Sequence, residues 1–162
     1  RTHPYAASID PNEMEVRLKL SAAKIGVGGS GTTDAKPCPL GFTYQEYREQ
    51  HNGVGCTSVG GLPARTVERL INIKKSCNCD LLITGGTERG HTPQTSPTDY
   101  THHGPGSPVV DINYNQKIAR FLKDEAEIFS IQRICVPDSL SFYRLNCNFD
   151  EGETHLHVQF SQ

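Results

Sequence analysis

Strict alternation of hydrophobic and polar residues over residues 155–160, His-Leu-His-Val-Gln-Phe, predicts a β-strand. Successive side chains of a strand point to opposite faces of a sheet. The three apolar residues of this stretch therefore face a core. His155 and His157 share the other face with Gln159, where two imidazoles two residues apart suit either a metal or catalytic site or an exposed surface strand.

Earlier hydrophobic patterns predict further elements. Residues 14–20 alternate and predict a half-buried strand, whereas the glycine-rich residues 26–41 predict a flexible connection. Apolar residues at helical spacing predict a helix that begins near Pro63 and ends before Cys77. Residues 81–83 predict a short buried strand.

The second half of the chain adds three strands and one helix. Residues 85–108 form a long loop that is rich in proline and glycine, and loops of this length in a compact domain are usually functional or disordered. Residues 109–112 predict a strand, and Asn113 with Gln116 predicts the N-terminal cap of a helix. Two further strands are expected at residues 128–136 and 142–147. Together with the helices, they predict an α+β domain with a small antiparallel sheet and flanking helices.

Length and charge exclude some classes of function. A chain of 162 residues fits one domain with a substantial core. A net charge of −2 gives no electrostatic case for nucleic-acid binding, and no apolar run reaches the ~20 residues of a membrane span. Because residue 1 is arginine and no signal peptide is recognisable, we expect a processed mature protein or an excised domain.

An even number of cysteines in loop-rich sequence favours disulfides and an oxidising location, either extracellular, at the cell surface or periplasmic. The six candidates are Cys38, Cys56, Cys77, Cys79, Cys135 and Cys147. Zinc-binding cysteines are the alternative, although no second closely spaced pair accompanies Cys77 and Cys79. We predict three disulfides, with Cys38 bonded to Cys56, and with Cys77 and Cys79 bonded to Cys135 and Cys147 in an order that the sequence leaves open.

Histidines and one aspartate supply the candidate metal chemistry. A catalytic zinc takes three protein ligands and keeps one position for water. His103, Asp111 and one of His155 or His157 would supply two nitrogens and a carboxylate. Glycine and proline between His103 and Asp111 let the backbone turn so that both side chains converge.

Four segments in this order resemble the zinc D-alanyl-D-alanine carboxypeptidase and L-alanyl-D-glutamate endopeptidase family, the VanX-like peptidases, whose fold is similar to the hedgehog signalling domain. They are Thr84-Gly85-Gly86-Thr87-Glu88, His103-x-x-Gly106, Val109-Val110-Asp111-Ile112 and His155-x-His157-Val158. The resemblance covers roughly residues 62–160. It implies a zinc domain over residues 62–162, with residues 1–61 as an N-terminal arm and a strand and loop extension packed on it.

The resemblance also implies which residues bind zinc. The metal ligands would be His103, Asp111 and His157, while His155 and His102 would support them or act as alternative ligands. The step from His103 to Asp111 is eight residues, one more than is usual in the family.

The catalytic residues depart further from the family pattern. The position of the family's catalytic carboxylate is Thr154 here, so we expect the neighbouring Glu153 to serve as general base, ahead of Glu151 and Glu88. Glu88 also stands where the family often has a substrate-binding arginine. Arg89, directly after it, is the candidate for oxyanion stabilisation, with Arg144 as a second choice.

The sequence therefore predicts a secreted zinc peptidase that hydrolyses peptidoglycan stem peptides at amide bonds with D-amino acids. The alternative is a non-catalytic zinc-bearing module for binding or assembly in an extracellular surface structure, and a third hypothesis is a disulfide-stabilised subunit without metal. Expected partners are peptidoglycan peptides or another extracellular polymer. The N-terminal arm is a candidate for self-assembly.

Overall fold

One mixed sheet with the three longest helices packed on one face forms the centre of the molecule. The computed structural model describes residues 12–29, 32–39, 42–88, 103–148, 150 and 154–162. Its helices are α1 (Glu13–Ala22), α2 (Tyr44–Gln50), α3 (Ala64–Cys77), α4 (Gln116–Asp124) and the 3₁₀ helix η1 (Asp138–Tyr143). Its strands are β1 (Gly26–Val27), β2 (Leu82–Gly85), β3 (Val109–Asn113), β4 (Ile131–Cys135) and β5 (His155–Phe160).

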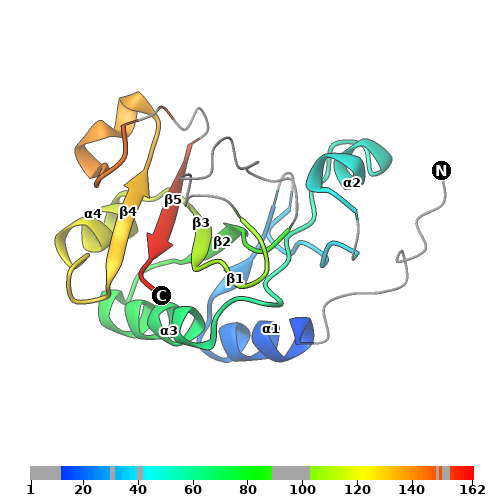
Figure 1. Cartoon of the computed structure of the whole chain (residues 1–162), viewed down its shortest axis with the longest axis horizontal. Coiled ribbons are helices and arrows are strands. Elements are labelled where there is room, and N and C mark those ends of the chain that lie inside the picture. Colours follow the sequence, from blue (N-terminus) through cyan, green and yellow to red (C-terminus); the bar gives the residue numbers. More distant parts are fainter. Residues whose placement is uncertain (1–11, 30–31, 40–41, 89–102, 149, 151–153) are drawn as a thin grey trace.

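The strand order β1-β2-β3-β5-β4 places β5 between β3 and β4 (Figure 1). Strands β2, β3, β5 and β4 pair antiparallel, as the sequence predicts, and β1 adds a parallel pair with β2 at one edge. A β1 strand inside the segment expected to be a flexible connection is a correction. Gly26 and Val27 pair with Leu82 and Ile83, so the short glycine-rich run is held by the sheet edge.

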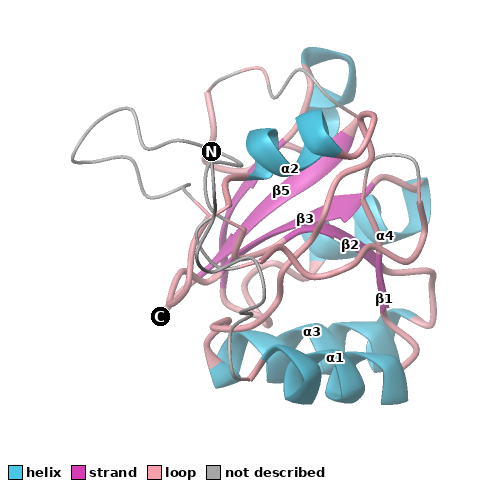
Figure 2. Ribbon diagram, turned by 90° about the vertical axis from the view of Figure 1, so that its right-hand side faces the viewer, coloured by secondary structure: helices cyan, strands magenta, loops and turns pink. Residues whose placement is uncertain are grey.

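The main core lies between the sheet and α1, α3 and α4, and α1 and α3 run side by side below the sheet in Figure 2. The sheet contributes Ile83, Ile112, Leu156, Val158 and Phe160, which are fully buried. The helices contribute residues such as Leu20, Leu70, Ile73, Ile118 and Leu122. Burial of this apolar surface is the main stabilising term for the fold.

The first element is a helix, so the strand predicted for residues 14–20 is wrong. Val16 and Leu20 lie four residues apart and face the core, whereas Met14 and Leu18 are exposed. The alternation fits a helix as well as a strand, because every second apolar residue in it lies four positions from the next. The charge pattern favours the helix, since Glu15 and Lys19 form an ion pair at 3.3 Å with the four-residue spacing that stabilises helices.

Two local predictions in the second half are also wrong. Asn115, rather than Asn113, caps α4, and its side-chain oxygen accepts a hydrogen bond from the backbone N–H of Ile118 at 2.9 Å. Asn113 is the last residue of β3, so the turn comes two residues later than expected. The strand predicted for residues 142–147 is replaced by the end of η1 and a single bridge between Leu145 and Ile134, because Pro137 turns the chain into a 3₁₀ helix after β4.

The disulfides are three, as predicted, and all six cysteines are bonded. Cys38–Cys56 is confirmed. Cys77–Cys79 and Cys135–Cys147 replace the pairing expected between the last four cysteines. Asn78 adopts the left-handed conformation at the end of α3, so the chain reverses and brings Cys79 back to Cys77 across one residue.

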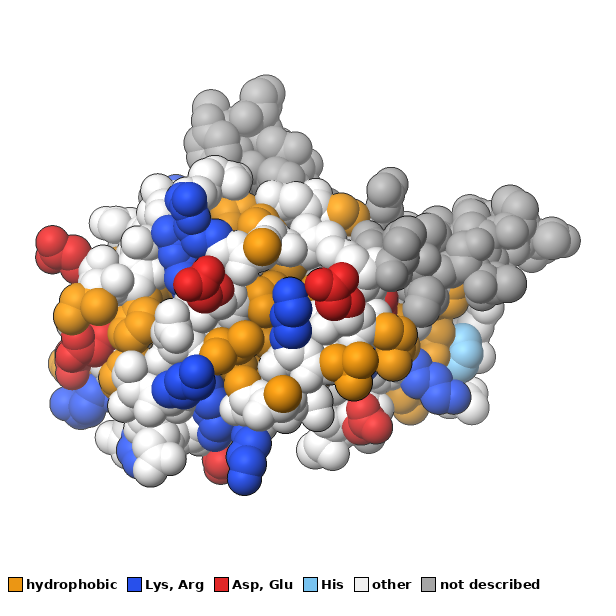
Figure 3. Space-filling model, turned by 90° about the horizontal axis from the view of Figure 1, so that it is seen from below, with side chains coloured by type: hydrophobic (Ala, Val, Ile, Leu, Met, Phe, Trp, Pro, Cys, Tyr) orange, Lys and Arg blue, Asp and Glu red, His pale blue; other side chains and the backbone are white. Residues whose placement is uncertain are grey.

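The outer surface of α1 and α3 carries acidic and basic side chains among hydrophobic ones (Figure 3). Glu15 and Lys19 of α1 face Glu68 and Lys75 of α3 across a groove of about 480 Å³. The two signs alternate, so this face presents no continuous basic patch of the kind that binds nucleic acid.

Candidate metal centre

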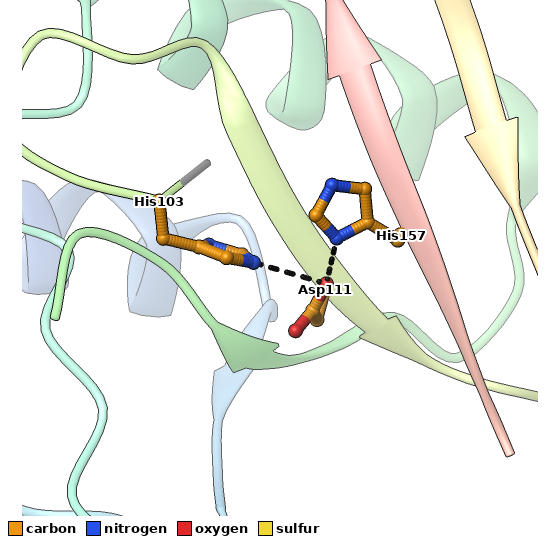
Figure 4. Close-up of side chains that lie close together, drawn as sticks. All are labelled: His103, Asp111 and His157. Carbon is orange, nitrogen blue, oxygen red and sulfur yellow. Dashed lines mark hydrogen bonds and ion pairs between the residues drawn. The ribbon is translucent and has the colours of Figure 1, made fainter. Parts of the chain in front are cut away.

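Three side chains from two distant parts of the sequence converge on the sheet face opposite α1, α3 and α4. Asp111 of β3 and His157 of β5 are directly opposite each other in the register, so they point to the same side. His103 approaches from the loop before β3 (Figure 4). All three are buried, with 1% of Asp111, 0% of His157 and 6% of His103 exposed.

The distances fit a shared cation. Asp111 Oδ1 lies 2.9 Å from Nδ1 of His157 and 3.3 Å from Nε2 of His103. One potential ligand atom from each residue lies within 4.8 Å of the others, and the two imidazole rings meet edge to face at 5.0 Å between centroids. Two nitrogens and one carboxylate oxygen at this spacing could hold a metal ion.

The second nitrogen of His103 is occupied by the backbone. Nδ1 lies 2.7 Å from the carbonyl oxygen of Gly86, to which it donates a hydrogen bond in the Nδ1–H tautomer. That tautomer leaves Nε2, the atom nearest Asp111, with its lone pair. Metal-binding histidines commonly have this arrangement, in which the outer N–H is bound and fixes the orientation of the ring. The residues present therefore fit a metal on the chemistry of the donors and on the tautomer of one of them.

His155 also reaches the aspartate. Its Nε2 lies 3.6 Å from Asp111 Oδ2. His155 and His157 share a sheet face, as the alternation predicts, although both are buried in the structure. His102 lies outside the described residues.

Two adjacent glycines make room for the aspartate and for the carbonyl of Ser58. Gly85 of β2 lies opposite Asp111, and a Cβ at this position would come within 2.6 Å of Asp111 Oδ2. At the next residue, Gly86, a Cβ would come within 2.2 Å of the Ser58 carbonyl oxygen. Glycine is therefore required at both positions for steric reasons, and the Thr84-Gly85-Gly86 motif serves as packing for the metal centre.

Glu88 binds Gly86, the residue whose carbonyl oxygen accepts from His103. Its buried carboxylate accepts hydrogen bonds from the backbone N–H of Gly86 at 2.9 Å and from that of Ser58 at 3.0 Å. The same Gly86 residue supplies the carbonyl that accepts from His103. Glu88 therefore supports a candidate metal ligand, His103, through the backbone, a role that the sequence did not suggest.

Residues 57–61 connect the first half of the chain to this support. Glu13 of α1, 1% exposed, accepts hydrogen bonds from the backbone N–H groups of Val59 and Gly60 at 2.9–3.1 Å. Arg17 donates to Glu13 at 2.8 Å and to the carbonyl oxygen of Thr57 at 2.5 Å. Residues 57–61, and through them α1, are thus linked by hydrogen bonds to the backbone around Gly86.

Most of the expected catalytic residues are not among the residues that the structure describes. Glu153, Glu151 and Arg89 lie outside the described residues. Arg144 donates hydrogen bonds to the Val136 carbonyl at 2.7 Å and to Asp138 at 3.0 Å, near the end of β4. Thr154, described just before β5, is exposed.

Comparisons with known proteins assign no family. No protein-family model, no curated protein and no solved structure matches the chain. None of the helices in the described part of the chain is long and apolar enough to cross a bilayer. The disulfides are compatible with an extracellular location.

Proposed function

We propose that this protein is a zinc-dependent peptidase that hydrolyses amide bonds of peptidoglycan stem peptides. The observation that supports it is the buried group of His103, Asp111 and His157, with two nitrogens and one carboxylate on one sheet face. This donor set is typical of catalytic zinc, which keeps one position for water. The sequence resemblance to VanX-like peptidases supports the substrate class.

Zinc in such a site lowers the pKa of a bound water toward 7 and polarises a scissile carbonyl. The residues of the chain would share the remaining work. His103, Asp111 and His157 would hold the ion, and Gly86 would keep His103 in the tautomer that ligates. Glu153 is the candidate to take the proton of the water and pass it to the leaving amine.

A non-catalytic zinc module is the second candidate, and specific residues favour it. Thr154 stands where the related peptidases have their carboxylate. Glu88 is buried with its carboxylate bound to the backbone of Gly86 and Ser58. If no carboxylate reaches the metal, the same ligands would stabilise a binding surface.

Metal analysis and a peptide assay distinguish the two. We expect one zinc per chain in native protein, and hydrolysis of muropeptides that stops on chelation and returns with zinc. His157→Ala should lose both, because it removes one of three ligands. His51→Ala, an exposed histidine on the end of α2, should keep both.

The possible results distinguish the peptidase from the binding module. Zinc at full occupancy without any hydrolysis would replace the peptidase with the binding module. Native protein that contains no zinc and takes up none would refute both proposals. Glu153→Gln should lower the hydrolysis rate while zinc stays bound.

A further inference from the structure

A second polar pocket lies beyond the edge strand β4. It has a volume of about 580 Å³, which is within the range of small-molecule sites. Its walls are formed by Arg133, Arg144, Asn146, Cys147 and Asn148. Two guanidinium groups and two carboxamides in one pocket are donors suited to an oxyanion.

The guanidinium groups have spare hydrogen-bonding capacity. Within the described part of the chain, the side chain of Arg133 has no hydrogen-bond or ion-pair partner. Nε of Arg144 is buried and also lacks a partner there, although the other end of this guanidinium binds Val136 and Asp138.

The charge balance of the pocket remains positive. Asp138 lies 3.0 Å from Arg144, but its side chain is 73% exposed and therefore well solvated. Arg133 is not neutralised by any described carboxylate. Planar guanidinium groups match carboxylates in geometry and bind them with two parallel hydrogen bonds.

Strand register places this pocket on the same sheet face as the metal centre. Cys135 of β4 is opposite His157, and the antiparallel bridge between Ile134 and Leu145 places Arg144 opposite Cys135. His157, Cys135 and Arg144 thus form one row across the sheet. At about 4.8 Å per strand, the Cα atoms of His157 and Arg144 are about 10 Å apart.

We propose that this pocket is an oxyanion subsite for a carboxylate group of the peptide whose amide bond lies at the metal centre. The identity of the peptide rests on the proposed function, whereas the binding of a carboxylate by Arg133 and Arg144 does not. A separation of about 10 Å corresponds to roughly three extended residues, so one short acidic peptide spans both places. The pocket would select acidic peptides over neutral ones.

Nuclear magnetic resonance of the arginine Nε–H groups tests the subsite in the intact protein. The probes are acetyl-tetra-D-alanine, in which three residues separate the second amide bond from the carboxylate, its C-terminal amide, and sodium sulfate, all at constant ionic strength. We expect the tetrapeptide to shift the signals of Arg133 and Arg144, and the amide to leave them unchanged. Arg133→Gln should weaken tetrapeptide binding at least tenfold, because it removes a guanidinium group that has no described protein partner.

The control is Arg65→Gln, which makes the same substitution at an exposed position of α3 on the other side of the sheet. It should change the dissociation constant less than twofold. Unchanged binding in Arg133→Gln, equal shifts with the amide, or tighter binding of sulfate than of the tetrapeptide would each overturn the carboxylate subsite. Because the measurement reports binding, a protein that hydrolyses no peptide can still confirm it.

Discussion

The carboxylate of Asp111 lies within 3.6 Å of three imidazoles. His103 and His157 lie near one of its oxygens and His155 near the other. With two neutral histidines and one carboxylate as ligands, a divalent cation would keep a net charge of +1. This charge favours a hydroxide or a ligand oxygen at the open position.

A single buried carboxylate outside the ligand set should control metal affinity. Glu88→Gln replaces one of the two oxygens that accept from the Gly86 N–H with an NH2 group that cannot accept. The Gly86 carbonyl should then hold His103 less firmly. We expect zinc affinity to fall about tenfold, as is usual when a supporting partner of a ligand is lost.

Competition with a chromophoric chelator measures this affinity, and the visible spectrum of the cobalt-substituted protein reports ligand geometry. Glu68→Gln, on the exposed face of α3, is the matched control and should leave both unchanged. A Glu88→Gln protein with wild-type affinity and an unaltered cobalt spectrum would show that Glu88 does not position the site.

Residue-scale chemistry was only partly predictable from the sequence. His103, Asp111 and His157 were recognisable because metal ligands occur in short motifs with characteristic neighbours. Glu13 and Glu88 were not, because their partners are backbone N–H groups, which every residue except proline has. Such contacts leave no pattern in the sequence. They can be recognised only once the position of the loop at residues 57–61 is known.

At the scale of elements, α1 acts as a support for the loop over residues 57–61. Its first residue, Glu13, is buried and bound to two backbone N–H groups and to Arg17. Asn12, just before the helix, accepts a hydrogen bond from the Gly61 N–H at 2.8 Å. The helix therefore fixes this loop through polar contacts in addition to the apolar contacts of Val16 and Leu20.

Removing the charge of Glu13 should destabilise the whole fold. In Glu13→Gln, the side chain loses an acceptor and leaves Arg17, whose side chain is only 14% exposed, without its carboxylate. Loss of one partner of a buried pair typically costs about 3 kcal/mol in the free energy of unfolding. Urea denaturation followed by circular dichroism measures this change.

Glu15→Gln provides a control in the same helix. Glu15 is 66% exposed and pairs with Lys19 on the surface, so its loss should cost less than about 0.5 kcal/mol. Equal effects of the two substitutions would mean that the hydrogen bonds of Glu13 contribute no more than a surface ion pair.

Element boundaries show where sequence patterns suffice. Strands β2, β3 and β5 were predicted because buried strands form short apolar or alternating runs. The helix α1 was missed because its alternation satisfies both periods, and β1 was missed because two residues cannot show a period. The order of strands is not encoded in any local pattern, since it depends on which edges meet after the chain collapses.

For the molecule as a whole, three disulfides each close a loop within one region of the chain. Cys38–Cys56 and Cys135–Cys147 span 18 and 12 residues, and Cys77–Cys79 spans 2. In the chain-entropy description, a disulfide stabilises a protein by restricting its unfolded state, and longer loops are restricted more.

Replacing both cysteines of a disulfide by serine should therefore give graded effects. We expect about 3 kcal/mol of destabilisation for the Cys38 and Cys56 pair and about 1.5 kcal/mol for the Cys77 and Cys79 pair. Equilibrium unfolding in urea compares the two double variants with the wild type. A larger loss from the short loop would indicate that packing around Cys77 and Cys79, rather than chain entropy, sets their contribution.

The central place of β5 has a consequence for how the protein is made. Strand β5 follows β4 in the sequence, yet it hydrogen bonds to both β3 and β4. A ribosome therefore finishes the other four strands of this sheet before the one that joins them, and the edges of β3 and β4 that pair with β5 have no partner until β5 arrives. Each disulfide connects cysteines that precede β5 and lie close in sequence, so all three can form earlier during synthesis. His157 arrives with β5, so closing the sheet and completing the metal centre are the same late step of folding.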